Sequence, residues 1–393
     1  MKILFVMTRA FNPNAAGVQR TTFKSGKYFV EQGLEVAYLS TKVSGHTEVQ
    51  FGELFHFREQ EEFNNKQNIQ YFEKVLFRWK PDVVINQMPY VKKLRSLLFA
   101  NKYKCGYTLL GCLHNSLFNF YSNLRHKLQA SLPNYMFNLV DHKIGLGAVQ
   151  YYHRIKHGRV LKQILDSHDH YVLLSPQNKD ELAYFVGDYK ADKLEVIPNS
   201  IPETIPSAID HKEKILLSVG RLDTVQKRAD LFLPIWEQIA PTLRKWKFII
   251  VGHGEYSKVL QQEIENKKIP NVCLAGYQIP EPYYKKASIF LMTSAYEGFP
   301  NTILEAHSHA CPVVAFNTYA ALSWIVNDQK DAKLISPYDV EAFAKVVVEL
   351  ARNDKERQAM QVAALENANR FTIDKVGQMW LELFNRISKN KIR

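Results

Sequence analysis

The sequence predicts an α/β protein with two doubly wound parallel sheets. Short, continuous apolar runs alternate with stretches whose apolar residues recur at helical spacing, which is typical of parallel strands buried on both faces. The chain has 393 residues, a length that suits two domains of roughly 150–200 residues each. A segment near 197–212 with prolines and charged residues separates two such series, and it predicts the linker between two Rossmann-like halves.

The first half is expected to span 1–197. It opens with the apolar run Ile3–Met7, which predicts the first strand, and a polar loop then leads to Gly17. A helical pattern follows and continues to about Glu31. Further strands, with helices between them, are expected at 34–39, 82–86, 107–110 and 171–175.

The second half is expected to span 198–374. Its strands are predicted at 215–219, 248–251, 272–275, 289–292, 313–316 and 333–335. The last helix, expected over 375–388, has an amphipathic pattern, so the segment 375–393 should pack back on the first half. Since ligands bind beyond the carboxyl ends of parallel strands, we expect the active site in an interdomain cleft.

The composition is that of an ordinary globular protein, with 46% apolar and 23% charged residues. The net charge of +12 indicates an anionic partner, such as a nucleic acid, a membrane surface or a phosphorylated ligand. Four cysteines occur without a C-x-x-C pair, which is typical of reduced thiols in a cytoplasmic protein. No run of 18 apolar residues or signal-peptide core is found, so no membrane span is expected.

Glu297 and Glu305 form the most informative pattern in the chain. They flank a turn that follows the strand expected at 289–292 and opens a helix, and a proline suits a first helical turn. Backbone N–H groups and a helix N-terminus at such a turn can bind phosphate, while the two carboxylates can meet sugar hydroxyls and a ribose diol. The turn residues expected to contact the ligand are Gly298, Phe299, Pro300 and Asn301. The bare pair has an alternative reading, because two such glutamates are often simply solvated.

Arg221 and Lys227 follow the first strand of the second half, after Gly220. Fixed cations at a strand end can stabilise the growing negative charge of a departing nucleoside diphosphate. The alternative is that both are ordinary loop cations.

Two other loops of the second half contain candidate ligand contacts. Gly252 and Gly254 end the strand expected at 248–251, but no third glycine completes a dinucleotide fingerprint. They would let the backbone pass close to a ligand or to a neighbouring element. Ile279 follows the strand expected at 272–275 and would give an apolar wall to a base, unless that segment is only a turn.

In the first half, Gly17 would allow close approach to a diphosphate or an acceptor. His114 follows the strand expected at 107–110, where it could bind a sugar hydroxyl or move a proton. Residues 117–165 interleave cations with aromatic residues and contain Asp141 as their acidic residue. This segment predicts a surface for an anionic membrane or a lipid diphosphate. A solvated helical hairpin is the alternative, and no motif accompanies a nucleic-acid interpretation.

Together these segments resemble the family-four retaining glycosyltransferases, which have the GT-B fold. Glu297 to Glu305 is similar to the family's E-x7-E motif, and Arg221 with Lys227 is similar to its phosphate-binding pair. The segment 196–200 resembles the family's hinge, and 16–19 resembles its Gly-Gly-x-Glu loop. His114 falls where the family commonly has an active-site histidine.

The resemblance implies a role for each residue. Glu297 would contact the donor sugar, where it has been considered for the catalytic carboxylate, and Glu305 would hold the ribose. Arg221 and Lys227 would neutralise the diphosphate. The family generally needs no metal, and no Asp-x-Asp pair for one is found here, so we expect no metal and no cofactor besides the nucleotide-sugar substrate.

The chain departs from the family pattern at four positions. Ala16 and Gln19 stand in the first loop, Arg228 replaces a usual glycine, and Ser200 replaces the hinge glycine. Arg221 and Lys227 are also one residue further apart than is most common. None of these departures removes a charge needed for catalysis.

The leading hypothesis is a cytoplasmic glycosyltransferase, peripheral on the inner face of the plasma membrane. It would transfer a sugar, with retention, from a UDP-sugar donor to a lipid-linked or oligosaccharide acceptor during bacterial surface polysaccharide biosynthesis. The alternatives are a nucleotide-sugar epimerase of the same fold and a non-catalytic scaffold. We expect no nucleic-acid partner.

Overall fold

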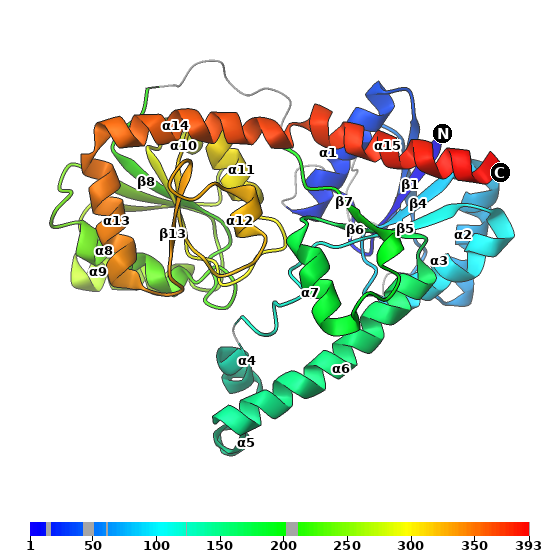
Figure 1. Cartoon of the computed structure of the whole chain (residues 1–393), viewed down its shortest axis with the longest axis horizontal. Coiled ribbons are helices and arrows are strands. Elements are labelled where there is room, and N and C mark those ends of the chain that lie inside the picture. Colours follow the sequence, from blue (N-terminus) through cyan, green and yellow to red (C-terminus); the bar gives the residue numbers. More distant parts are fainter. Residues whose placement is uncertain (13–16, 42–50, 60–61, 123, 202–210, 393) are drawn as a thin grey trace. The chain divides into compact units, whose positions relative to one another are not determined.

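The computed structural model describes residues 1–12, 17–41, 51–59, 62–122, 124–201 and 211–392 (Figure 1). The chain divides into two compact units. Unit 1 consists of Met1–His114, Ala148–Ser200 and Ile373–Arg393, and unit 2 consists of Asn115–Gly147 and Ile201–Thr372. The segment Asn115–Gly147 therefore groups with unit 2, although the expected boundaries included it in the first half. The middle of the expected linker lies outside the described residues.

Unit 1 is built on a seven-stranded parallel sheet with the order β3-β2-β1-β4-β5-β6-β7. Its strands are β1 (Lys2–Val6), β2 (Glu35–Ser40), β3 (Glu53–His56), β4 (Val83–Asn86), β5 (Thr108–Cys112), β6 (His170–Leu173) and β7 (Leu194–Val196). The sequence did not predict β3 and β7. Both are short edge strands that lack the continuous apolar run of a buried strand.

The helices of unit 1 cover both faces of this sheet. They are α1 (Val18–Glu31), α2 (Lys66–Trp79), α3 (Lys92–Cys105), α7 (Gln177–Val186), α15 (Ile373–Ile392) and most of α6 (Lys143–Ser167). Successive residues of a strand point to opposite faces. Ile3 and Phe5 accordingly join a core cluster with α1 and α15, while Leu4 and Val6 join one with α2 and α3.

The C-terminal helix α15 lies beside α1 in unit 1 (Figure 1). The Phe29 ring of α1 meets the rings of Phe384 and Trp380 at centroid distances of 5.2 and 6.1 Å. These edge-to-face pairs lie in a buried core, so the end of the chain is an integral part of the N-terminal sheet's packing.

Unit 2 is built on a six-stranded sheet with the order β10-β9-β8-β11-β12-β13. Its strands are β8 (Ile215–Val219), β9 (Lys247–Val251), β10 (Val272–Gly276), β11 (Ile289–Met292), β12 (Val313–Phe316) and β13 (Ala332–Ile335). Each pairs in parallel with its neighbours. The apolar runs of the central strands β8, β11 and β12 are almost wholly buried, as the sequence predicts for central parallel strands, whereas the edge strand β10 has no buried residue.

The remaining helices belong to unit 2. They are α4 (Leu124–Ser131), α5 (Asn134–Val140), α8 (Phe232–Ile239), α9 (Ser257–Lys267), α10 (Glu281–Lys286), α11 (Asn301–Ser308), α12 (Leu322–Ile325), α13 (Val340–Arg352) and α14 (Asp354–Ala368). The expected fold class, two Rossmann-like α/β halves, is confirmed.

The two sheet orders fix where ligands can bind. In unit 2 the chain proceeds outward in one direction from β8 and in the other from β11, and in unit 1 it does the same from β1 and β4. The crevice beyond the carboxyl ends of such strand pairs is where open α/β sheets hold their ligands. Within the described part of the chain, no helix has the length and apolar character needed to cross a membrane.

Candidate active site

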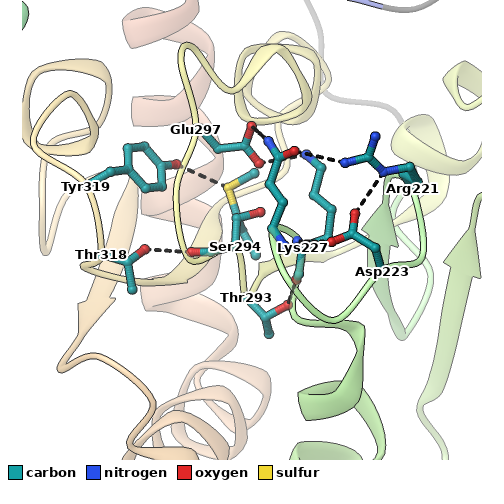
Figure 2. A network of polar contacts seen from close by, with 10 residues as sticks. Arg221, Asp223, Lys227, Thr293, Ser294, Glu297, Thr318 and Tyr319 are labelled. Carbon is teal, nitrogen blue, oxygen red and sulfur yellow. Dashed lines mark hydrogen bonds and ion pairs between the residues drawn. The ribbon is translucent and has the colours of Figure 1, made fainter. Parts of the chain in front are cut away.

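A cluster of charged side chains lies at the carboxyl ends of β8 and β11, the switch point of unit 2. The loop after β8 contributes Arg221 and Lys227, and the loop after β11 contributes Glu297 (Figure 2). A small pocket between these strand ends is lined by Gly220, Arg221, Lys227, Thr293 and Ser294, among others. The structure thus brings Glu297 beside two cations that precede it by 70 residues or more.

Lys227 and Glu297 form the central ion pair of this cluster. The Lys227 ammonium donates a hydrogen bond of 2.7 Å to Oε1 of Glu297. Gln226 donates through Nε2 to the other carboxylate oxygen at 3.2 Å. Glu297 is 6% exposed, and a carboxylate so buried needs this compensation. An ammonium has three donors, so Lys227 can hold Glu297 and still bind a further anion.

Asp223 fixes the loop that carries both cations. Its Oδ1 accepts hydrogen bonds from the backbone N–H groups of Val225, Gln226 and Lys227, at 3.1, 2.6 and 3.2 Å. Its Oδ2 accepts from Nε of Arg221 at 2.8 Å. Burial opposes ionisation of Asp223, but Arg221 and the backbone donors outweigh it and hold the pKa of the carboxyl below its usual value.

Arg221 lies at the rim of the cluster. The hydrogen bond to Asp223 raises the pKa of its guanidinium above the usual value, against the opposing effect of burial. Its NH2 group also donates to Oε1 of Gln226 at 3.0 Å. The side chain remains 62% exposed, so a held but solvent-facing guanidinium is presented to an incoming ligand.

Two hydrogen bonds to backbone carbonyl groups hold the two site loops together. Ala295 N–H donates to the Gln226 carbonyl at 2.7 Å, and the Thr293 hydroxyl donates to the Lys227 carbonyl at 2.7 Å. The sequence analysis did not single out Asp223, Gln226 or Thr293. Their one sequence signal is proximity to Arg221, Lys227 and the end of β11.

Helix α11 begins at Asn301, after Pro300, with Glu305 in its second turn. The turn is less open than expected, because Asn301 N–H bonds the Phe299 carbonyl at 3.0 Å and Ile303 N–H bonds the Pro300 carbonyl at 2.9 Å. These two N–H groups are therefore already engaged. Glu305 is half-buried.

Phe299, which was expected to contact the ligand, instead packs against other aromatic residues of unit 2. Phe299 is buried and packs edge-to-face with Trp324 and Phe371, at centroid distances of 6.3 and 5.8 Å. Gly298 joins it to Glu297, so the packing of Phe299 anchors the loop from which the Glu297 carboxylate projects.

Gly252 and Gly254 lie against the cation-bearing loop. A Cβ at Gly252 would come 1.8 Å from the Gly220 carbonyl oxygen, and one at Gly254 would come 2.2 Å from the Leu222 carbonyl oxygen. Gly220 and Leu222 donate their N–H groups to the carbonyls of Val251 and His253, at 3.0 and 3.2 Å. Both glycines therefore permit close backbone packing that shapes the Arg221 loop.

Ile279 is strongly exposed on the loop after β10. It follows Gly276, which has a φ of 69° and so turns the chain at the end of that strand. No hydrogen bond or ring contact of Ile279 with the charged cluster is observed among the described residues.

Gly17 and His114 belong to unit 1. Gly17 precedes α1 with a φ of 72° and has open space where a Cβ would stand. His114 follows β5 and hydrogen-bonds through Nε2 to Oε1 of Gln87, at 2.6 Å. Gln87 follows β4 and was not anticipated. Burial lowers the pKa of His114 to about 4, so its imidazole is neutral near neutral pH. A joint action of His114 with the unit 2 residues stays a prediction.

The chemistry of the unit 2 cluster suits a ligand with both phosphates and hydroxyls. Arg221 and Lys227 present charge-assisted donors for phosphate oxygens. Glu297 is an acceptor for hydroxyl groups and, as an anion, would repel a phosphate placed directly against it. Among the described residues, no group of three or more His, Cys, Asp or Glu side chains is arranged to hold a metal ion.

Residues 213–353 match the family described as "Glycosyl transferases group 1". An amylovoran biosynthesis glycosyltransferase of Erwinia amylovora is 28% identical over 177 residues, which are 44% of this chain and 49% of that protein. A poly(ribitol-phosphate) α-N-acetylglucosaminyltransferase of Staphylococcus aureus is 30% identical over 176 residues, which are 44% of this chain and 36% of that protein. The alignments thus span about half the length of these relatives, or less.

Solved structures match nearly the whole chain. S. aureus TarM, in a complex with fondaparinux, α-GlcNAc-glycerol and UDP, superimposes with a TM-score of 0.74 at 16% identity, over 98% of this chain and 99% of TarM. The lipopolysaccharide outer core galactosyltransferase WaaB gives 0.69 at 18% identity, over 100% of both chains. The expected resemblance is confirmed: residues 213–353 match the group 1 glycosyltransferases, and the chain has the GT-B fold.

Proposed function

We propose that this protein is a retaining glycosyltransferase that uses a nucleotide-diphosphate sugar as donor. The observation that carries the proposal is the cluster at the switch point of unit 2. Two cations, Arg221 and Lys227, are held beside a buried carboxylate, Glu297. A nucleotide sugar has a diphosphate for the cations and hydroxyls for the carboxylate, so one ligand satisfies both halves of the cluster.

The proposed transfer breaks one bond and forms one. The bond between the anomeric carbon and the β-phosphate oxygen of the donor breaks, and a bond from that carbon to an acceptor hydroxyl oxygen forms on the same face. The departing diphosphate takes the acceptor's proton. Arg221 and Lys227 stabilise the charge that grows on the diphosphate, while Glu297 orients the sugar.

Relatives and structural neighbours support the choice of substrates. TarM and the Anabaena protein HepE were solved with UDP, and we infer a UDP-sugar donor here. A Campylobacter jejuni relative, 25% identical over 217 residues, is named for an undecaprenol-diphosphate-linked acceptor. We infer a lipid-linked or oligosaccharide acceptor in bacterial surface polysaccharide synthesis, with the enzyme in the cytoplasm at the inner face of the plasma membrane.

A donor panel tests the proposal. The protein is incubated with UDP- and GDP-sugars, and donor consumption and nucleotide release are followed by mass spectrometry. Transfer, or slow hydrolysis of one donor, supports the proposal. An isomerised sugar would indicate the epimerase alternative, and intact donors throughout would indicate a scaffold.

Two further measurements define the reaction class. NMR of the product reports the anomeric configuration, which should match that of the donor if the enzyme retains it. Transfer should also persist in excess EDTA, because protein cations neutralise the diphosphate in the proposed mechanism. A strict requirement for a divalent cation would contradict that assignment of Arg221 and Lys227.

A further inference from the structure

One stripe of helix α6 exposes large apolar side chains. Ile144, Tyr151, Tyr152 and Ile155 are 80%, 65%, 65% and 40% exposed. With Ala148 they follow the spacing i, i+4, i+7, i+8, i+11, which places them on one side of a helix. Large apolar groups gathered on one exposed face mark an interaction surface more often than scattered ones do. We call this set the α6 stripe.

The cations of α6 surround the α6 stripe. At 100° per residue, Arg154 and Lys156 flank it on opposite sides, and Arg159 and Lys162 continue it toward the C-terminal end. From His142 to Leu165 the sequence contains five Lys or Arg residues and no acidic residue. An apolar stripe bordered by Lys and Arg is typical of helices that lie in a lipid interface.

The α6 stripe is not part of the folded core. The buried residues of α6 are Gly158, Leu161, Ile164, Leu165 and Ser167, and none of the described residues 143–157 is buried. A Cβ at Gly158 would come 2.7 Å from the Phe185 carbonyl oxygen, so the second half of α6 lies tightly against α7. The helix is thus anchored at one end, while its first half exposes its apolar side chains. Figure 1 shows α6 as a single long helix.

Charge selects among the partners that could cover this surface. A second copy of α6 would bring five more cations against the first five, and like charges disfavour that pairing. A nucleic acid would meet the cations, but Ile144 and Ile155 offer nothing to a phosphate backbone. An anionic bilayer satisfies both features, because its headgroups attract the cations and its acyl boundary accepts the apolar side chains.

We propose that α6 docks on an anionic lipid bilayer, with Ile144, Tyr151, Tyr152 and Ile155 inserted among the headgroups. The inference rests on the proposed function in one respect, because a lipid-linked acceptor requires the enzyme to work at a membrane. None of these four side chains belongs to the Arg221, Lys227 and Glu297 cluster, so binding to lipid and transfer of sugar can be measured independently.

Vesicle flotation of the full chain tests the proposal. The protein should bind vesicles that contain phosphatidylglycerol and should bind pure phosphatidylcholine vesicles far more weakly. Combining Ile144→Ser, Tyr151→Ser and Ile155→Ser should weaken binding more than about ten-fold, since each removes buried apolar area. Combining Lys156→Gln, Arg159→Gln and Lys162→Gln should weaken it about five-fold per cation, with a smaller dependence on salt.

A matched control comes from unit 1, to which most of α6 belongs. Phe77 on α2 and Tyr103 on α3 are 81% and 75% exposed, and Phe77→Ser combined with Tyr103→Ser should leave vesicle binding unchanged. All variants should melt close to the wild type and release UDP from a donor at an unchanged rate. Equal loss in the control and the α6 variants would overturn the proposal, as would absence of wild-type binding.

Two outcomes separate the competing explanations. If sedimentation velocity shows a wild-type dimer that the serine variant dissociates, the α6 stripe joins two copies and the lipid proposal is wrong. If every variant and the wild type fail to consume any donor while vesicle binding follows the pattern above, the enzymatic proposal fails and the lipid proposal is supported.

Discussion

Lys227 is proposed to bind the diphosphate of the donor while it pairs with the buried carboxylate of Glu297. In Lys227→Ala the ammonium that pairs with Glu297 at 2.7 Å is lost, and a largely buried carboxylate remains without its cation. The diphosphate also loses a donor that should act most strongly as its charge grows. We expect kcat/KM to fall by about 10²- to 10³-fold, the range seen when one fixed donor to a developing charge is removed. Steady-state nucleotide release measures it.

Two comparisons make the Lys227 experiment specific. Lys227→Arg keeps the charge and should retain more activity than Lys227→Ala. Lys245 is exposed in the same unit, and Lys245→Ala should behave as the wild type. Near-normal turnover in Lys227→Ala would contradict the proposed role of Lys227 in stabilising the diphosphate.

Gln87 positions His114 in unit 1. Because the Gln87 carbonyl oxygen accepts from Nε2 of His114 at 2.6 Å, that nitrogen carries the proton and Nδ1 is left as an acceptor. Burial lowers the pKa of His114 to about 4, so we expect it to act as a neutral acceptor for a hydroxyl.

Gln87→Glu tests this role of His114. A carboxylate beside Nε2 would favour imidazolium and raise the pKa of His114. The acid limb of the kcat profile should then move to higher pH, while Gln87→Leu should lower kcat/KM by about five-fold, the effect of one hydrogen bond. Superimposable pH profiles for Gln87→Glu and the wild type would show that His114 does not titrate in the reaction.

At the scale of elements, two glycines hold the cation-bearing loop against the end of β9. Gly252 has a φ of 145°, and an added Cβ would lie 1.8 Å from the Gly220 carbonyl oxygen. Gly252→Ala must therefore displace backbone that leads directly to Arg221. We expect a loss of about 2 kcal/mol or more in unfolding free energy and a raised KM for the donor. Chemical denaturation and steady-state kinetics measure these two effects.

Gly276→Ala is the matched control for that variant. Gly276 also has a positive φ, of 69°, but nothing lies within 4 Å of the position of its Cβ. Its alanine variant should show only the backbone cost of roughly 1–2 kcal/mol. If both variants lost equal stability with unchanged donor KM, close packing at Gly252 would not shape the Arg221 loop.

Central strands could be predicted from sequence because burial on both faces imposes a continuous apolar run. The run at Ile3–Met7 became β1, shifted by one residue to Lys2–Val6, and the run at 289–292 became β11 with the expected bounds. The edge strand β3 could not be found in this way, because its Glu53–His56 segment is mostly half-buried. Pairing with β2, which lies in a different part of the sequence, defines it.

The candidate site was also predictable only in part: residues that follow apolar strands could be identified from sequence, but contacts that depend on the folded loops could not. Arg221, Lys227 and Glu297 could be nominated because they follow apolar strands, and parallel strands place their carboxyl ends together. The role of Gln226 could not, because it depends on a 3.2 Å hydrogen bond to Glu297 on a loop 71 residues further along the chain. The role of Asp223 could not either, because it depends on the folded shape of its own loop, which aims the N–H groups of Val225, Gln226 and Lys227 at one carboxylate oxygen. The backbone N–H groups of the turn and of the start of α11 were expected to be open, but local turn bonds engage those of Asn301 and Ile303.

At the scale of the whole molecule, both units place polar groups after two central strands of a parallel sheet, but the chemistry of these groups differs. Unit 2 places cations and a carboxylate at its switch point between β8 and β11. Unit 1 places neutral groups, Gln87 and His114, after β4 and β5. This contrast fits a division in which unit 2 binds the anionic donor and unit 1 meets sugar or acceptor hydroxyls, as the proposed function requires.

Acid should destabilise both units through buried neutral histidines. His168 in unit 1 and His307 in unit 2 are 1% and 0% exposed, and burial lowers the pKa of each from 6.5 to about 4. Between those values the unfolded chain binds a proton that the folded chain does not. Stability is therefore fully present above about pH 6.5 and is lost as the pH falls toward 4, by up to about 3 kcal/mol for each histidine.

Denaturant unfolding at a series of pH values between about 7 and about 5 measures this loss. His168→Gln and His307→Gln should lower stability at neutral pH, yet each should flatten the pH dependence because one proton-binding difference is removed. His211 is exposed, and His211→Gln should leave the slope unchanged. Equal slopes in all four proteins would mean that carboxylates, rather than buried imidazoles, cause the acid sensitivity of this fold.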